Sequence, residues 1–117
     1  MSRRANGALE TDVLGVLWDA DGALTPGEVR DSLGGDLAYT TVMTVLTRLF
    51  AKGLVTRIQQ GRAFAYSPAQ TRSELAAQRM RDVLADAGDH AGALTGFVGG
   101  LSKRDADLLR RIIGDKR

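Results

Sequence analysis

Apolar positions in the first part of the chain recur at the spacing of amphipathic helices. The first helix is expected from about Leu9 to Asp19, and its buried face comprises Leu9, Val13, Val16 and Leu17. A short second helix begins after Thr25, because Thr25 and Glu28 form a capping box and Pro26 suits the first helical position. Gly34-Gly35 ends this helix after about two turns.

The third predicted helix, at about 39–52, has two contrasting faces. Its buried face comprises Val42, Val45, Leu46 and Leu49, with Phe50 beside them. The opposite face carries hydroxyl groups and one cation but no acid. We expect four of its residues to read base edges: Tyr39, Thr40, Thr41 and Thr44. The alternative is a solvated threonine face without a partner, and threonine is only a mediocre helix former.

A β-hairpin follows this helix. Alternation predicts strands at 54–59 and 62–66, joined by a turn at Gln60-Gly61, with Phe64 and Tyr66 on one face. The predicted order is a first helix, a second and a third helix joined by a short glycine-containing turn, and then a hairpin. This is the order of a winged helix-turn-helix. The fold class is therefore mainly α (α+β), with a recognition helix at about 39–52 and a wing at about 55–66.

The tail is predicted to be helical and rich in apolar residues. A long helix begins with a capping box at Thr71 and Glu74 and continues to Gly88, and Ser102 with Asp105 caps the last helix. Three short helices cannot bury so many apolar side chains against one another, so we expect a second copy to cover them. The predicted dimerisation residues are Leu75, Val83, Leu84, Leu94, Phe97, Val98, Leu101, Leu108, Leu109, Ile112 and Ile113. The expected domains are 1–70 for DNA binding and 71–117 for dimerisation.

Composition excludes several kinds of chemistry. The chain has 117 residues, 44% of them apolar, no cysteine and one histidine, His90. We therefore expect no disulfide, thiolate metal site, cofactor or catalytic triad, and no enzyme activity. Residues 1–8 resemble a flexible basic arm. No apolar segment follows Arg3-Arg4, and no segment is long enough to span a bilayer, so we expect a cytoplasmic protein without membrane insertion.

Charge is distributed unevenly along the chain. Residues 10–36 contain seven acids and one base, whereas residues 37–73 contain five bases and no acid. A one-sign surface confined to one structural unit is typical of a phosphate-binding face, although a chance gap in acids is the plain alternative. We expect the following residues to contact the DNA backbone: Arg48, Lys52, Arg57, Gln60, Gly61 and Arg62.

Other functions remain open at this stage. Some winged helices bind proteins instead of DNA, and such a module would carry an apolar outer face on the third helix. A ligand-gated regulator would need polar groups converging among the apolar residues of the tail, and few are present there. A small hydrolase is disfavoured because the common nucleophile and metal motifs are missing.

Specific segments resemble the penicillinase repressor family (BlaI/MecI). They are LETDVLGVLW at 9–18, LAYTTVMTVLTRLFAKGLV at 37–55 and GRAFAYSP at 61–68, with a weaker match at 93–98 and 108–112. The resemblance covers nearly the whole chain. It implies a homodimeric transcriptional repressor that binds palindromic operators of β-lactamase and other genes. It also implies base reading by Thr40 and Thr41, with Arg48 and Gly61-Arg62 near the DNA backbone.

The resemblance extends to the mode of inactivation. In characterised family members, a membrane metalloprotease sensor triggers cleavage of the repressor at an Asn-Phe bond. That bond aligns with Gly96-Phe97, the possible proteolytic site of this chain, where glycine replaces the asparagine. A related branch of the family senses copper through paired cysteines, which this chain lacks.

Overall fold

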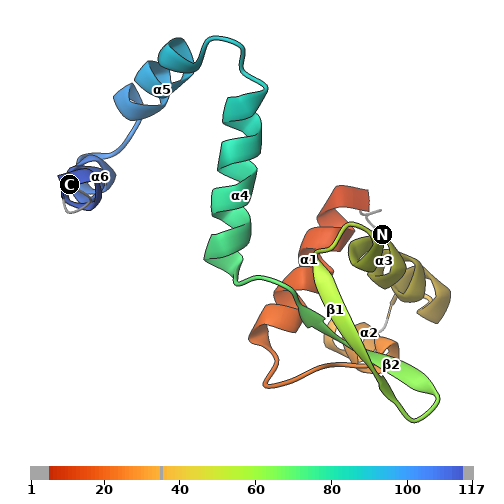
Figure 1. The fold of residues 1–117 in the computed structure, drawn as a ribbon. Coiled ribbons are helices and arrows are strands. Elements are labelled where there is room, and N and C mark those ends of the chain that lie inside the picture. The colour runs from red at the N-terminus through yellow and green to blue at the C-terminus, as the bar shows by residue number, and fades with distance from the viewer. Residues whose placement is uncertain (1–5, 35, 115–117) are drawn as a thin grey trace. The chain divides into compact units, whose positions relative to one another are not determined.

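A computed structural model of the protein describes residues 6–34 and 36–114. This part of the chain folds into six helices and one two-stranded sheet (Figure 1). The elements are α1 (Asn6–Asp19), α2 (Pro26–Ser32), α3 (Tyr39–Ala51), β1 (Val55–Gln60), β2 (Ala63–Pro68), α4 (Arg72–Ala85), α5 (His90–Gly99) and α6 (Lys103–Gly114). Their order confirms the predicted winged helix-turn-helix with a helical C-terminal region. The chain divides into two compact units, up to Leu75 and from Ala76 onward.

The first unit has a core formed by α1, α2, α3 and the hairpin. The four positions predicted for the buried face of α3, namely Val42, Val45, Leu46 and Leu49, are all buried. The Tyr66 side chain is among the largest that are fully buried. The backbone of Tyr66 exchanges hydrogen bonds of 2.9 and 2.7 Å with Leu24, which ties the loop before α2 to the sheet. The core therefore holds the helix-turn-helix and the hairpin together.

Local signals set the ends of α2 and α3. The Glu28 amide donates to the Thr25 hydroxyl at 3.3 Å, and the Thr25 amide donates to the Glu28 carboxylate at 2.8 Å, as the predicted capping box requires. At the end of α3, Gly53 has a φ of +76°, and the Leu54 amide donates to the Leu49 carbonyl at 2.9 Å. Because the helix cap uses the amide of Leu54, β1 begins only at Val55.

The hairpin is antiparallel and displaced by one residue from the prediction. The register runs from Val55 opposite Pro68 to Gln60 opposite Ala63, so the turn is formed by 61–62 and not by 60–61. Gly61 has a φ of +65°, a conformation that a glycine adopts without strain. The left-handed position therefore falls on the first residue of a two-residue turn, which leaves Gln60 paired in the sheet.

Three further details of the first unit differ from the prediction. The first helix begins at Asn6 and not at Leu9, so 6–8 are helical; the rest of the predicted arm, 1–5, lies outside the described residues. Leu14 is fully buried and Val16 only partly, because α1 packs against α2, α3 and β2 and is covered over a wide arc. Phe50, predicted beside the buried face of α3, is 39% exposed and lies outside the core.

The second unit consists of helices with well-formed starts but no buried side chain. The predicted cap at Ser102 is present, and Asp89 caps α5 by accepting from the Gly92 amide at 2.9 Å. The predicted cap at Thr71 is also present, at the start of α4 in the first unit. Helix α4 ends at Ala85, earlier than predicted, because a turn at 86–88 leads to Gly88 with a φ of +75°. No described residue after Leu75 is buried, so these helices have no core of their own.

Candidate nucleic-acid interface

Helix α3 presents a face of threonines and one tyrosine to solvent. Tyr39, Thr40, Thr41 and Thr44 are all exposed, and Thr40 and Thr44 lie opposite the face that packs into the core. The residue before the helix, Ala38, supplies no side-chain cap. The first turn of α3 therefore keeps the positive end of the helix dipole without a competing acceptor. This end of α3 suits a ligand that offers oxygen or nitrogen acceptors.

The threonine hydroxyls of α3 differ in their hydrogen bonds. The Thr44 hydroxyl donates to the Thr40 carbonyl at 2.9 Å, which fixes its rotamer and leaves its oxygen to accept a further bond. Within residues 6–34 and 36–114, no hydrogen bond is formed by the hydroxyls of Thr40 and Thr41. A hydroxyl of this kind can both donate to and accept from a base edge. The start of α3 therefore carries uncommitted groups at the positions predicted to read bases.

The cations predicted to contact the DNA backbone fall into two groups. Arg48 near the end of α3 and Arg62 at the turn of the hairpin are exposed, and neither forms an ion pair within the described part of the chain. Lys52 differs, because its ammonium lies 2.9 Å from both carboxylate oxygens of Glu10 on α1. A phosphate would have to compete with Glu10 for Lys52, whereas Arg48 and Arg62 have no such competitor. Gln60 and Gly61, also exposed, lie beside Arg62 at the hairpin turn.

Arg57 of β1 has a setting that the sequence pattern did not predict. Its guanidinium carbon lies 3.9 Å from the ring centroid of Phe50 on α3 and 4.1 Å from that of Phe64 on β2. Each such contact contributes about 0.5–2 kcal/mol, and more where water is excluded. The hairpin pattern could have indicated the contact of Arg57 with Phe64, because the two residues occupy diagonal positions on one face of the hairpin.

A surface hollow of about 600 Å³ lies elsewhere in the first unit, between the end of α1 and the segment after β2. The Trp18 indole donates to the Gln70 carbonyl at 2.9 Å, and the Arg72 guanidinium lies 4.9 Å from the Trp18 ring centroid and 4.0 Å from Asp19. In each of these contacts a residue of α1, Trp18 or Asp19, interacts with Gln70 or Arg72 after β2. The contacts connect the segment after β2 to α1.

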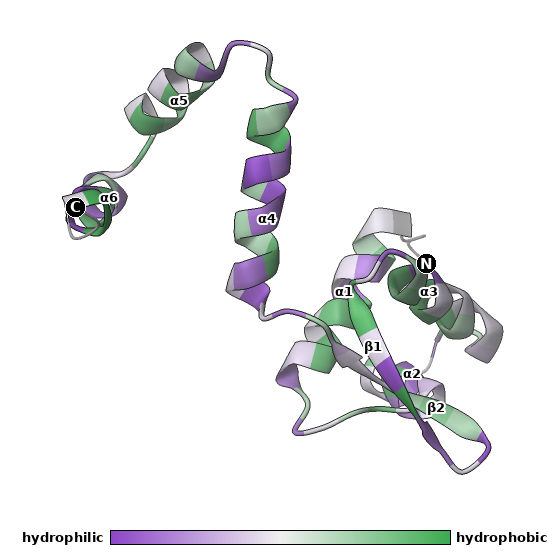
Figure 2. Cartoon of the chain, viewed as in Figure 1, coloured by the Kyte–Doolittle hydropathy of each residue, from purple (hydrophilic) through white to green (hydrophobic). Residues whose placement is uncertain are grey.

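Most of the predicted dimerisation residues are exposed. Apolar positions recur along α4, α5 and α6 (Figure 2), and several large side chains there are 45% exposed or more: Val83, Leu94, Phe97, Val98, Leu108, Ile112 and Ile113. Leu84, Leu101 and Leu109 are half-buried. Leu75 differs from the prediction, because it is only 4% exposed and belongs to the core of the first unit. The first turn of α4 covers that core, so Leu75 is not free for a partner.

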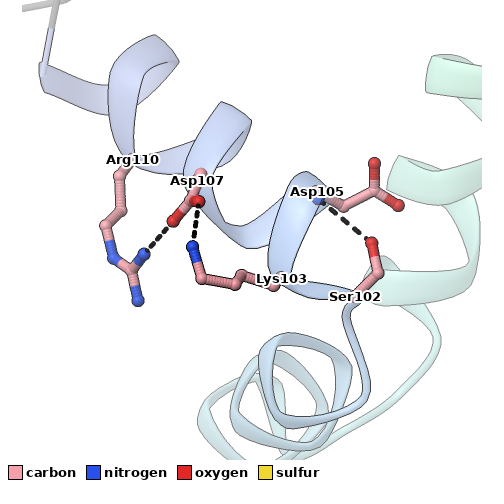
Figure 3. A network of polar contacts seen from close by, with 5 residues as sticks. All are labelled: Ser102, Lys103, Asp105, Asp107 and Arg110. Carbon is pink, nitrogen blue, oxygen red and sulfur yellow. Dashed lines mark hydrogen bonds and ion pairs between the residues drawn. The ribbon is translucent and has the colours of Figure 1, made fainter.

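Helix α6 separates its polar and apolar residues. Asp107 accepts from Lys103 at 3.1 Å and from Arg110 at 2.6 Å, and the Ser102 hydroxyl accepts from the Asp105 amide at 3.1 Å (Figure 3). Lys103, Asp107 and Arg110 follow helical spacing and share one side of α6. The opposite side carries the apolar stripe 108, 109, 112 and 113. The polar network therefore keeps Lys103, Asp107 and Arg110 away from that stripe.

A second hollow lies between α4 and α5 and is apolar. It has a volume of about 620 Å³, and its lining includes Met80, Val83, Leu84, Leu94 and Phe97. Among residues 6–34 and 36–114, no group of three or more acidic or histidine side chains is arranged to hold a metal ion. None of the helices in the same part of the chain combines the length and hydropathy that crossing a membrane requires.

Similarity to known proteins assigns the family. The family model described as "Penicillinase repressor" matches residues 6–115. The "Transcriptional regulator BlaI" of two Mycobacterium tuberculosis strains is 43% identical over 114 residues, covering 93% of this chain and 83% of those proteins. A MarR family protein from Bacillus stearothermophilus superimposes with a TM-score of 0.49 at 17% identity, over 92% of this chain and 69% of that chain. The structure of Streptococcus pneumoniae FabT in complex with DNA superimposes with a TM-score of 0.48 at 19% identity, over 92% of this chain and 70% of that chain. On the family match and the BlaI identity, the chain belongs to the penicillinase repressor family, whose members are not enzymes, and it is a DNA-binding transcriptional repressor.

Proposed function

We propose that this protein is a homodimer that represses β-lactamase or related genes in the cytoplasm by binding a palindromic operator. Each protomer places α3 in the major groove and the β1–β2 hairpin, as a wing, on the adjacent backbone. The observation that carries the proposal is that α3 and the hairpin, residues 39–68, contain no acid. There the uncommitted hydroxyls of α3 and the unpaired guanidiniums of Arg48 and Arg62 belong to the same structural unit.

The proposal assigns two roles within that surface. Base reading falls to the start of α3, at Tyr39, Thr40, Thr41 and Thr44, because hydroxyl groups there can reach base edges. Backbone contact falls to Arg48, Arg57 and the wing residues 60–62. Lys52 stays a weaker candidate for the backbone, since Glu10 already neutralises it. An apolar outer face on α3 would instead favour a protein partner.

Dimerisation is assigned to the helices from Ala76 onward. A monomer would leave the stripe of α6 and the hollow between α4 and α5 in contact with water, and an exposed surface of this kind marks an interaction site. A two-fold dimer would present two copies of α3 to half-sites about 34–36 Å apart, or a multiple of that distance. Binding of both half-sites by one dimer then supplies the affinity that one protomer lacks.

Inactivation by proteolysis is assigned to α5. Phe97 is exposed, and this ten-residue helix contains Gly92, Gly96 and Gly99, each of which lowers helix stability by up to about 1 kcal/mol. Helix α5 should therefore open easily unless a partner covers it. Cleavage at Gly96-Phe97 would detach α6 and its apolar stripe. Because glycine replaces the family's asparagine at this bond, either a protease of different specificity acts here or the inducing signal is not proteolytic.

Salt dependence of DNA binding tests the proposal. Fluorescence anisotropy with a labelled duplex of random sequence measures the affinity over a range of salt concentrations. Arg48→Gln and Arg62→Gln should each lower the slope of log K against log salt by about 0.9 for every phosphate that the variant no longer neutralises. Arg72→Gln is the matched control, because it removes the same charge from an arginine that is paired with Asp19. Equal salt slopes for the wild type and the three variants would exclude α3 and the wing as the DNA-binding surface.

A further inference from the structure

Arg57 joins the recognition helix to the wing. Its guanidinium lies between the ring of Phe50, in the last turn of α3, and the ring of Phe64, in the strand that returns from the wing. The ring centroids lie 3.9 and 4.1 Å from the guanidinium carbon, so both rings are in contact with it. This side chain therefore adds a contact between the hairpin and α3 outside their shared core.

The stacking leaves the hydrogen-bonding capacity of Arg57 unused. A guanidinium carries five N–H donors in its plane, and aromatic rings contact its π face without accepting those bonds. Within residues 6–34 and 36–114, Arg57 forms no ion pair and no hydrogen bond. The side chain is partly buried, so its rotamer is held by packing and its donors have a fixed direction.

The two phenylalanines have no role in the core. Each ring remains 39% exposed, although large apolar side chains normally gain stability by full burial. Their shared contact is the guanidinium of Arg57. In a stretch of 37 residues without an acid, an anion that approaches these donors meets no carboxylate from that stretch.

We infer that Phe50, Arg57 and Phe64 form a preorganised site for one phosphate of the DNA backbone, located where the recognition helix meets the wing. Arg57 binds the phosphate. The two phenylalanines are positioning residues that hold its guanidinium with the N–H donors directed toward solvent. The inference rests on the proposed function. It adds that the rings of Phe50 and Phe64 contribute to DNA affinity although they do not carry charge.

Four variants separate the charge of Arg57 from its position. Arg57→Gln removes the charge, whereas Arg57→Lys keeps the charge but loses the planar group that stacks between the rings. Phe64→Leu and Phe50→Leu remove one ring each and leave Arg57 in place. Arg72→Lys is the matched control, because Arg72 also lies against an aromatic ring, that of Trp18, outside α3 and the wing.

The measurement is again anisotropy with a labelled duplex of random sequence over a range of salt. Arg57→Gln should lower the salt slope by about 0.9 for each protomer that contacts DNA. Arg57→Lys and the two leucine variants should bind roughly five- to tenfold more weakly at one salt concentration, with an unchanged slope, because the charge stays but is no longer held in place. Arg72→Lys should bind as the wild type does.

Three results would overturn the inference. An unchanged slope for Arg57→Gln would mean that Arg57 contacts no phosphate. Wild-type affinity in both leucine variants would mean that the rings do not position it. A decrease in affinity that follows the decrease in thermal stability across the variants would assign the stack to folding alone. If wild-type protein bound the duplex and Arg48→Gln and Arg62→Gln lowered the slope, the proposed function would stand even when the inference fails.

Discussion

Thr41 stands at the start of α3 with no hydrogen bond to its hydroxyl within the described part of the chain. Thr44, one turn further on, already donates to the Thr40 carbonyl. The difference matters because a hydroxyl committed to its own helix has less freedom to adapt to a base edge. Thr41 is one of two such threonines at the start of α3, and its loss should change sequence preference without changing charge.

We expect Thr41→Ala to weaken binding to the selected operator by about 1–3 kcal/mol per half-site and to leave binding to random duplex nearly unchanged. The reason is that a base contact contributes to the specific complex only. Thr11→Ala on α1 is the control, since that hydroxyl donates to the Gly7 carbonyl away from α3. An equal loss of affinity on random DNA would remove Thr41 from base readout.

Sequence periodicity predicted most individual core positions but not the stacked arginine. The buried face of α3 follows from helical spacing alone, because one face of an amphipathic helix must be covered. Spacing does not tell how far the covering elements reach, so Phe50 was assigned to the core although it extends beyond it. The contact between Phe50 and Arg57 depends on the packing of β1 against α3, which no local pattern records.

At the scale of elements, the starts of helices were more predictable than their ends. Capping boxes at Thr25 and Thr71 use residues three positions apart, so the sequence contains the complete motif. The end of α4 was placed too late, because the chain leaves the helix in a turn before Gly88, which has a φ of +75°. The hairpin register was displaced by one residue, because the turn type depends on which residue takes the left-handed conformation.

We predict that Thr25→Ala lowers the free energy of unfolding by about 0.5–2 kcal/mol, because it removes the hydroxyl that caps α2. Urea denaturation monitored by Trp18 fluorescence provides the measurement. Thr56→Ala removes an exposed threonine from β1 and is expected to change stability by less than about 1 kcal/mol. Comparable losses in the two variants would mean that the cap has no special contribution.

At the scale of the whole molecule, the two units differ in what holds them together. The first unit has a continuous core that includes Leu75, whereas no described residue of the second unit is buried. Helices with exposed apolar stripes and little packing of their own are marginal in water. In the proposed homodimer, a second copy of the same stripes would cover this exposed surface.

Ile112→Asp should convert the dimer to a monomer in sedimentation velocity, because it places a charge in the apolar stripe of α6. Operator affinity should then fall by about 100-fold or more, since each half-site binds alone. Lys103→Gln makes the same change of one unit of charge on the opposite, polar side of α6 and should stay dimeric. A dimeric Ile112→Asp protein would exclude this stripe from the interface.

Selection of bound sequences from a random pool of duplex DNA tests the central claim most directly. A two-fold dimer that reads bases with α3 should enrich an inverted repeat whose half-sites lie about one helical turn, roughly 34–36 Å, or a multiple of it apart. Thr41→Ala should relax the preference at one position in each half-site. Enrichment of a single, unrepeated site, or of no sequence at all, would contradict a symmetric repressor that reads DNA through α3.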